Sequence, residues 1–352
     1  MSVELYEPRR MLTSLEQRKI PFSFFLDTFF KEEDISYTDA IDIDIDRGGK
    51  RVMAAFVNPR LQGQAVERRG FRTRSYKPPY VKPKRITTAE DALKRQMGET
   101  LVNSGISPAQ RAARLVGKDL GELDDMIWRR EEWMASCALQ DGIIIVQGEG
   151  VDDEIDFDML DTHKVVLTGN ARWSQHTTAT PLKNLRNYSI DLIQEDSGLV
   201  PGIAVFGRDA WDDFMACEEV VGTSTGSKSL FDMRAIDVGR IDPKPLAAGG
   251  VTYQGYIKEI NMELFTYAGK FWNDLTGTSE WLMHPDKVLI GCADARCVRH
   301  YGPIKDLDSM IPVRRFPKTW TEKDPSARFL MVQSAPLVAN HQPDAFVCVT
   351  VR

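Results

Sequence analysis

The clearest pattern of hydrophobic and polar positions is a helical one between residues 107 and 140. Apolar residues recur at steps of three and four, which places them on one stripe and the charged residues on the other face. Ser107 can cap the first turn, and Pro108 fits there because its missing N–H is not needed. At about 1.5 Å per residue, the pattern predicts a spine about 50 Å long with one side buried against sheets. The stripe consists of Val116, Leu120, Leu123, Ile127, Met134 and Cys137.

Alternating apolar and polar residues predict a hairpin on each side of this helix. After it, residues 143–146, a glycine-containing turn at 148–150 and the alternation over 155–159 form one pattern. Before it, isoleucines alternate with aspartates over 41–45, a Gly-Gly turn follows, and 52–57 reads as the second strand.

The second half of the chain predicts a mixed domain of about 130 residues, in which helices and strands succeed one another. An amphipathic helix over 182–198 precedes a buried strand at 203–206 and a second helix at 209–217. We therefore expect an α+β fold. Further strands are expected at 254–265, 287–291, 313–321, 327–333 and 345–351.

Charge is distributed very unevenly along the 352 residues, although the formal net charge is only −6. Residues 58–86 hold nine basic residues and one acidic residue, whereas 141–161 hold eight acidic residues and no basic one. Opposite charges of this size predict attraction between the two segments. Residues 59–84 are rich in Arg, Gly and Pro, and this stretch is too long for an ordinary connection.

Two explanations of this basic loop stay open. Its interleaved basic and aromatic residues could follow a nucleic-acid backbone, with rings available for stacking. However, no nucleic-acid-binding fold signature surrounds it, and a charged run more often faces solvent or a protein partner.

Five phenylalanines within nine residues form a cluster near the N-terminus. Rings of this size must be covered, either by the chain's own core or by a neighbouring subunit. Both alternatives remain open. The five are Phe22, Phe24, Phe25, Phe29 and Phe30.

No motif for catalysis, a metal or a cofactor is complete, so we expect a protein that is not an enzyme. Residues 222–229 resemble a phosphate loop, but Ser227 occupies the place of the glycine that must precede Lys228. The five cysteines are scattered, which favours a reducing compartment, and the histidines are dispersed. There is neither a signal-peptide pattern nor an apolar run near the roughly 20 residues that a membrane span needs, so we expect a soluble cytoplasmic product.

The C-terminal end closely resembles that of the lambda-type phage major capsid proteins, the major capsid protein E family. Further similarity occurs at Arg69 with Gly70, over 80–84, at Trp173 and around Trp211. The resemblance covers nearly the whole chain. Its most specific part comprises Phe316, Pro317, Lys318, Trp320, Asp324, Pro325, Phe329, the run 333–337, Pro343, Asp344, Phe346, Val347 and Val349.

This resemblance implies the Hong Kong 97-type tailed-phage capsid fold. The implied parts are an N-terminal arm (1–40), an extended loop with its stem (41–90), a peripheral domain with the spine helix (91–165 and 300–335) and an axial domain (166–299 and 336–352).

The implied function is that of a major capsid protein, which self-assembles into the icosahedral head shell enclosing the phage genome. Implied partners are further copies in hexamers and pentamers, a decoration protein, a scaffold, a portal, and packaged double-stranded DNA bound without sequence specificity. The protein would be assembled in the host cytoplasm and reside in the virion. An encapsulin-like cargo compartment and a nucleic-acid binder using residues 59–86 are the alternatives.

The resemblance also implies where subunits touch. The basic loop would lie over an acidic surface of an adjacent subunit, with the 141–161 hairpin as one candidate, and the N-terminal phenylalanines would be a second contact. We expect a decoration protein rather than lysine cross-links to stabilise the shell. The implied loop contacts are Arg68, Arg69, Phe71, Arg72, Arg74, Tyr76, Lys77, Tyr80, Lys82 and Lys84.

Overall fold

The structure is a computed structural model that describes most of the chain. Several predicted features lie outside the described residues: Phe22, the Gly-Gly turn at 48–49 with Val52, Arg68, Arg69, the cap Ser107 and the segment 222–229. The described residues are 8–16, 23–46, 53–60, 62, 70–88, 90, 108–221, 247–248, 250–274, 276–306, 312–324 and 326–352.

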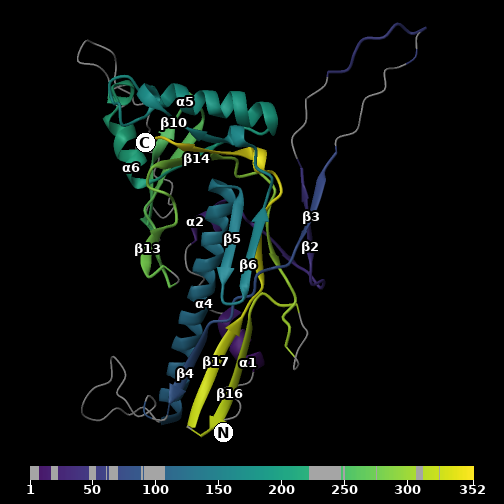
Figure 1. Ribbon diagram of the computed structural model, residues 1–352, viewed down its shortest axis with the longest axis vertical. Helices are drawn as coiled ribbons and strands as arrows, with labels where there is room; N and C mark the ends of the chain where they lie inside the picture. Colours follow the sequence, from purple (N-terminus) through teal and green to yellow (C-terminus); the bar gives the residue numbers. More distant parts are fainter. Residues whose placement is uncertain are drawn as a thin grey trace.

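The predicted spine is helix α4, Pro108–Gln140, whose 33 residues run up the long axis of the molecule (Figure 1). Leu120, Leu123, Ile127 and Met134 of the predicted stripe are buried, as expected. The prediction that the charged face is solvated is wrong, because several of its carboxylates are enclosed by other segments. The buried acids are Asp119, Asp124, Glu131 and Glu132.

A seven-stranded sheet crosses the upper end of the molecule (Figure 1). The predicted strands at 203–206 and 287–291 are confirmed without shift, and 254–265 is a hairpin of two strands rather than one. In spatial order the strands are β7 (Lys164–Val166), β19 (Phe346–Thr350), β14 (Lys287–Gly291), β8 (Ile203–Phe206), β11 (Met262–Tyr267), β10 (Val251–Ile257) and β9 (Ala247–Ala248).

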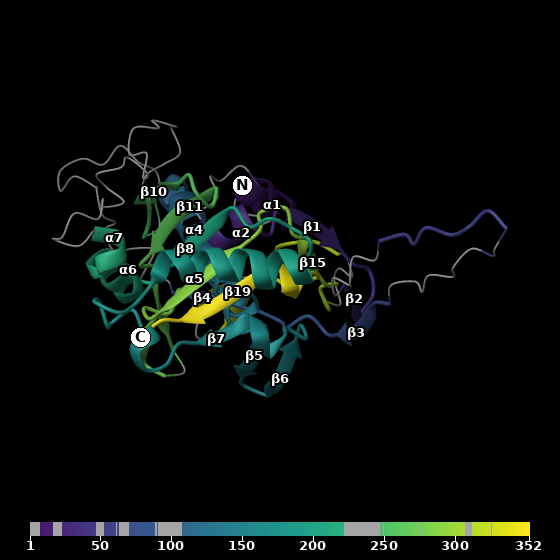
Figure 2. The same ribbon diagram turned by 90° about the horizontal axis from the view of Figure 1, so that it is seen from above.

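Helices flank this sheet, and Figure 2 shows α5 lying across it. The predicted helix over 182–198 begins as an α-helix, continues as a π-helix over Tyr188–Gln194, and stops before Gly198, whose φ is +79°. The helical elements here are α5 (Pro181–Asn187), the π-helix η4 (Tyr188–Gln194), α6 (Arg208–Ala216) and α7 (Glu218–Val221), with short 3-10 turns η2 (Asp161–His163), η3 (Gly169–Ala171) and η5 (Pro343–Ala345).

A three-stranded sheet lies at the opposite end, beside the first half of α4 (Figure 1). One of its faces packs on α4 and on helix α1 (Pro8–Glu16) through Met11, Leu123, Leu330 and Val332. The strands, in spatial order, are β16 (Phe316–Lys323), β17 (Ser326–Gln333) and β4 (Lys84–Thr88).

Smaller sheets complete the fold. The acidic hairpin predicted after the spine is confirmed as β5 (Ile143–Gly148) and β6 (Val151–Asp156). The others are the sheet of β1 (Glu32–Ile35), β15 (Cys297–Tyr301) and β18 (Pro336–Asn340), and the hairpin of β12 (Lys270–Asn273) and β13 (Thr278–Trp281). Among the described helices, none is both long and apolar enough to cross a membrane.

The extended loop has a different stem from the predicted one. Strand β2 (Ile41–Ile45) pairs with β3 (Arg72–Tyr76), whereas 53–57 forms no strand. Ile41, Ile43 and Ile45 lie opposite Tyr76, Arg74 and Arg72. Long amphipathic side chains can cover apolar neighbours with their stems. Strand β3 therefore shows no alternation of apolar and polar residues by which the sequence would reveal it.

Four of the phenylalanines are buried in the chain's own core. Phe24 and Phe25 belong to helix α2 (Phe24–Thr28) and pack on Tyr267, while Phe29 meets Phe346 edge to face. These rings and Phe30 are at most 4% exposed. They leave no surface for a neighbouring subunit, so the intersubunit role implied for Phe24, Phe25, Phe29 and Phe30 is corrected in favour of ordinary packing.

Replacing Phe25 with alanine should therefore destabilise the unassembled subunit. The ring is fully buried against Tyr267, and such truncations cost about 3–5 kcal/mol. Phe56→Ala, at a fully exposed position, is the control that should leave stability unchanged. Denaturant unfolding of the unassembled subunit measures both, and equal stabilities would contradict burial within one chain.

Candidate functional site: anchors of the N-terminal segment and the extended loop

The stem of the extended loop is fixed to the acidic hairpin by charge. Arg74 Nη1 donates to Asp156 Oδ2 at 2.8 Å, and Arg72 Nη1 donates to Asp158 Oδ2 at 2.8 Å. The Tyr76 hydroxyl donates to the Asp156 carbonyl oxygen at 2.7 Å. Burial raises the pKa of Asp156, but the Asp158 backbone N–H and Arg74 outweigh it and hold that pKa below its usual value.

The predicted attraction between the basic loop and the acidic hairpin thus exists, but it joins parts of one chain. An intersubunit role of Arg72, Arg74 and Tyr76 through this hairpin is corrected accordingly.

Other loop residues contact the rest of the chain or are exposed to solvent. The Tyr80 hydroxyl donates to Gln333 Oε1 at 2.9 Å and accepts from the Lys305 backbone N–H at 3.1 Å. Lys82 lies over the Tyr80 ring, with Nζ 5.2 Å from the centroid. Lys84 is in β4, Lys77 borders a surface pocket beside the hairpin, and Phe71 is 67% exposed.

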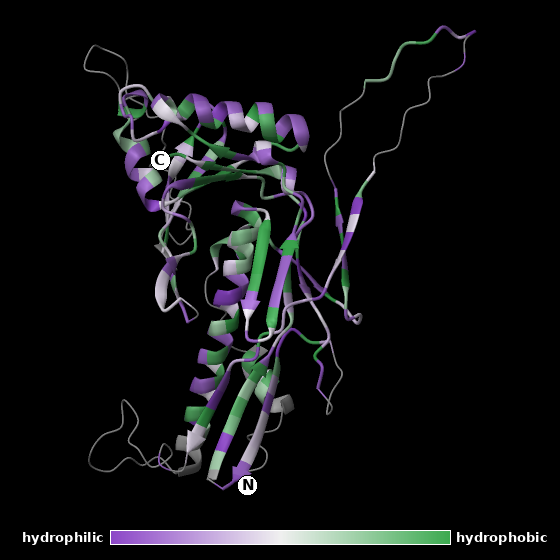
Figure 3. Cartoon of the chain, in the orientation of Figure 1, coloured by the Kyte–Doolittle hydropathy of each residue, from purple (hydrophilic) through white to green (hydrophobic). Residues whose placement is uncertain are grey.

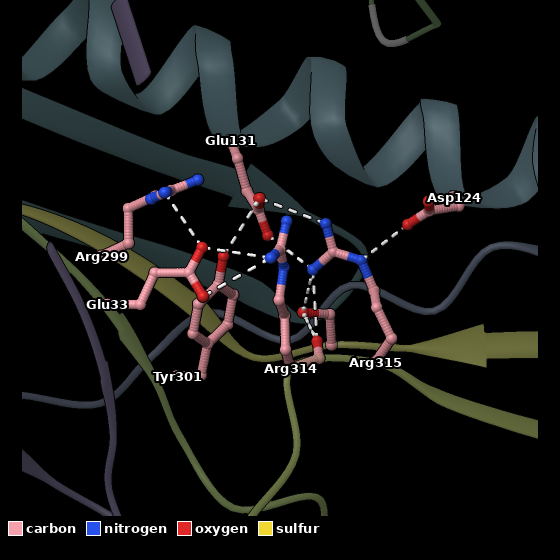
Figure 4. Close-up of polar contacts among 8 residues, drawn as sticks. Glu33, Asp124, Glu131, Arg299, Tyr301, Arg314 and Arg315 are labelled. Atoms are coloured by element: carbon pink, nitrogen blue, oxygen red, sulfur yellow. Dashed lines mark hydrogen bonds and ion pairs between the residues drawn. The ribbon is translucent and has the colours of Figure 1, made fainter. Parts of the chain in front are cut away.

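A buried ionic cluster joins the spine to the segment that leads into β16 (Figure 4). Arg315 binds Glu131 with two hydrogen bonds of 2.7 and 3.1 Å, and its Nε donates to Asp124 at 2.8 Å. All three side chains are less than one tenth exposed. Burial opposes the charge on Arg315, yet Glu131 and the other neighbours raise its pKa, so the guanidinium stays charged.

The same cluster captures the N-terminal strand β1. Glu33 accepts hydrogen bonds from Arg314 at 3.1 Å and pairs with Arg299 at 2.9 Å (Figure 4). The guanidinium groups of Arg314 and Arg315 lie 4.2 and 5.3 Å from the Trp128 ring centroid, within cation–π range. The cluster therefore ties three segments that are far apart in sequence to about two turns of α4, between Asp124 and Glu131.

A third carboxylate of the spine caps helix α2. Glu132 accepts the backbone N–H groups of Phe25 and Leu26 at 2.8 and 3.1 Å and the Tyr267 hydroxyl at 3.1 Å. Burial raises the pKa of Glu132 to about 7. The three hydrogen-bond donors lower this pKa, and the negative charge of Asp27 raises it, both by less than burial does.

Two histidines connect the N-terminal segment with the loop stem. His300 Nδ1 lies 3.0 Å from Asp34 Oδ2, the two Nε2 atoms of His300 and His341 are 3.1 Å apart, and His341 Nδ1 lies 2.8 Å from the Asp44 carbonyl oxygen. Both outer partners accept, so three hydrogen bonds require three ring protons, whereas two neutral imidazoles carry two. With both rings neutral, one of the three contacts therefore lacks its proton.

Sequence reasoning missed this pair, Glu132 and the Arg315 cluster. The partners in these contacts are more than forty positions apart in sequence and belong to different elements, so no local motif reveals them. Among the described residues, no group of three or more His, Cys, Asp or Glu side chains is placed to hold a metal ion. Burial raises the pKa of the Cys292 thiol to about 12 and that of Cys217 to about 11, which leaves both unreactive near neutral pH.

An N-terminal segment bound along a spine helix, a projecting two-stranded loop and sheets at both ends define a Hong Kong 97-type capsid fold. A crystal structure described as the putative capsid protein of a prophage of Escherichia coli CFT073 has this fold, with a TM-score of 0.72, 21% identity, and coverage of 98% of this chain and 99% of that one.

Residues 7–351 match the family described as phage major capsid protein E, and the chain belongs to this family. It is 28% identical over 358 residues to the major capsid protein of Escherichia phage lambda, covering 99% of both chains. It is also 28% identical over 359 residues to the major capsid protein of Enterobacteria phage P21, again covering 99% of both.

Arg315→Met should destabilise the subunit by about 3–5 kcal/mol, because it leaves Glu131 and Asp124 buried without their cation. Arg186→Met, which removes a surface ion pair with Glu259, should cost less than about 1 kcal/mol. Chemical denaturation of the unassembled subunit compares the two. Similar losses for both variants would show that the cluster does not anchor the fold.

Stability should fall when the pH drops below about 6.5, the ordinary histidine pKa. Burial lowers the pKa of both His300 and His341 more than Asp34 and the Asp44 carbonyl oxygen raise it, so the unfolded chain binds protons at these two positions more readily than the folded one. Protonating both rings would set their two Nε2–H groups against each other.

His341→Gln should flatten this acid-induced loss, whereas His284→Gln, at an exposed histidine, should not. Unfolding titrations at several pH values between 7 and 5 give the slope, which is at most about 1.4 kcal/mol per pH unit for each proton. Glu132 acts in the opposite direction, since its raised pKa adds stability as the pH falls from about 7, so each variant is compared with the parent chain at the same pH. An unchanged slope in His341→Gln would contradict the role of the pair.

Proposed function

We propose that this chain is a major capsid protein that self-assembles into the icosahedral head shell enclosing a phage genome. Membership of the phage major capsid protein E family over nearly the whole length supports this function. So do relatives of full length named major capsid protein.

The structural observation that carries the proposal is the projecting loop. Residues 53–60 extend away from the body (Figure 2), and Met53 and Phe56 on it are 87% and fully exposed. Apolar side chains displayed at a distance from the core favour burial against another molecule. The chain thus offers a contact that its own fold does not satisfy.

We further propose the four-part organisation of arm, extended loop, peripheral domain and axial domain with the boundaries expected from the sequence. The seven-stranded sheet at one end of the spine and the three-stranded sheet at the other support a division into axial and peripheral parts. Repeated contacts between copies would then give hexamers and pentamers, since closed shells arise from symmetric repetition of a few interfaces.

The proposed partners beyond other copies are a decoration protein, a scaffold and a portal during assembly in the host cytoplasm. Packaged double-stranded DNA would be held inside without sequence-specific binding. The net charge of −6 supports weak contact with DNA, because like charges repel the phosphates. The proposed surface contacts in the loop are Phe71, Lys77, Tyr80, Lys82 and Lys84, together with Arg68 and Arg69.

The alternatives have less support. An encapsulin-like compartment shares the fold, but the matched family is a phage capsid family. A nucleic-acid binder using 59–86 would need free cations, and Arg72 and Arg74 are engaged with Asp158 and Asp156.

Replacing residues 53–60 with a Gly/Ser linker of equal length should block assembly without unfolding the subunit. The segment is outside every described strand and its apolar side chains are exposed, so its loss removes little intrachain packing. Cryo-electron micrographs of the parent chain should show uniform closed shells, and those of the variant none. Normal shells from the variant, at unchanged unfolding midpoint, would exclude the loop as an assembly contact.

A further inference from the structure

Two histidines present ring nitrogens to each other at a separation that the fold fixes. The Nε2 atoms of His300 and His341 are 3.1 Å apart, and the two residues are only 7% and 4% exposed. His300 is in the central strand of the β1–β15–β18 sheet. The His341 N–H donates to the Arg296 carbonyl oxygen at 3.1 Å, and the His341 carbonyl oxygen accepts from the Asp46 N–H at 2.9 Å. Backbone hydrogen bonds therefore hold both residues in place.

The outer nitrogen of each ring faces an acceptor. His300 Nδ1 lies 3.0 Å from Asp34 Oδ2, and His341 Nδ1 lies 2.8 Å from the Asp44 carbonyl oxygen. Asp44 belongs to β2, whose alternating isoleucines and aspartates give this strand of the loop stem both hydropathy colours in Figure 3. Since an ionised carboxylate and a carbonyl oxygen only accept, both contacts are satisfied when each neutral ring carries its proton on Nδ1. The two Nε2 lone pairs then face each other, and a cation bound by both removes their repulsion.

Metal-binding histidines in proteins have this arrangement. Such a residue almost always donates its second ring N–H to a carboxylate, a backbone carbonyl oxygen or water, which fixes the tautomer and the ring orientation. Asp34 and Asp44 provide the first two kinds of acceptor. With metal–nitrogen distances of about 2.0–2.1 Å, nitrogens 3.1 Å apart subtend an angle of about 100° at the ion. That angle lies between those of octahedral and tetrahedral coordination.

The charges around the pair also favour a cation. Asp34 and Asp44 place two negative charges near the rings. Burial is the main cause of the lowered pKa of both rings, and the positive charge of Arg296 lowers it further. Arg296 is exposed, so water and salt screen its charge. Asp34, by contrast, contacts the His300 ring directly.

We propose that His300 and His341 bind one divalent transition-metal ion of the zinc type through their Nε2 atoms, with water in the remaining ligand positions. Imidazole is a suitable ligand for Zn²⁺, Ni²⁺ and Cu²⁺. Two protein ligands are fewer than the four of a closed structural zinc site, so the ion binds reversibly. With the ion bound, both Nδ1–H groups donate outward, one to the N-terminal strand β1 and one to the loop stem. The ion therefore secures both attachments at once.

Zinc counting tests the site in the unassembled full-length chain. Protein is freed of metal by a chelator, which is then removed, and is dialysed against zinc chloride before bound zinc is measured by mass spectrometry. At saturation, the parent chain should bind one ion more than His341→Gln does. His284→Gln, at an exposed histidine, is the control and should bind as much zinc as the parent. X-ray absorption of the zinc-loaded parent chain should show scattering from two imidazole rings.

Asp34→Ala separates the proposed geometry from a general effect of charge. Asp34 is a positioning residue that orients His300 without touching the ion, so its loss should weaken zinc binding at least about tenfold. Glu32→Ala removes an equal charge from the same strand, at a position paired with Val298 instead of His300. This control should change the zinc affinity by less than about twofold, because the charge is exposed and screened.

Three results would overturn the metal site. They are equal zinc binding by the parent chain and His341→Gln, zinc absorption spectra without imidazole scattering, and equal zinc affinities of Asp34→Ala and Glu32→Ala. Circular dichroism verifies that each variant folds. If His341→Gln does not fold, the absorption spectrum of the parent chain and the comparison of Asp34→Ala with Glu32→Ala decide, since both of these substitutions are at exposed positions.

Discussion

The buried ion pairs along α4 are the constraint on which the rest of the structure depends. Taking Glu131, Asp124 and Arg315 out of water is costly, and only a nearly complete set of partners offsets that cost. Arg315 satisfies two carboxylates at once, and the neighbouring Arg314 and Arg299 hold Glu33 of the N-terminal strand. A displacement of any one segment would leave a buried charge without its partner. The N-terminal strand β1, the spine α4 and strand β16 therefore adopt one relative position.

Charge and apolar surface consequently have different tasks in this molecule. Opposite charges such as those of Arg74 and Asp156 form ion pairs within one chain, and these pairs fix the position of the loop stem. Met53 and Phe56 are among the large apolar side chains that remain exposed, and they lie on the loop that extends away from the body of the chain. A body whose segments are joined by internal ion pairs, with an apolar loop that the same chain leaves exposed, suits a subunit whose remaining contacts are made by other copies.

Elements that bury one apolar stripe could be predicted from the sequence alone. Helix α4 and the acidic hairpin follow their hydrophobic periodicity, and strands β8 and β14 are short continuous apolar runs that are buried almost throughout. Strand β3 could not, because Arg72, Arg74 and Tyr76 cover the isoleucines of β2 with amphipathic side chains. The buried acids of α4 were missed for a related reason: their partners, such as Arg315 for Glu131, lie 184 positions away.

The histidine pair shows how a chain can couple two of its parts without any local motif. His300 holds the N-terminal segment through Asp34, and His341 holds the loop stem through the Asp44 carbonyl oxygen. The hydrogen bond between the two rings connects these attachments. If one attachment is lost, the number of ring protons that the remaining hydrogen bonds need also changes. The N-terminal segment and the loop stem are thus linked electrostatically, although they do not belong to the same sheet. A subunit that must present its loop in one direction gains from this coupling, because the stem cannot reorient without disturbing the segment that the spine already fixes.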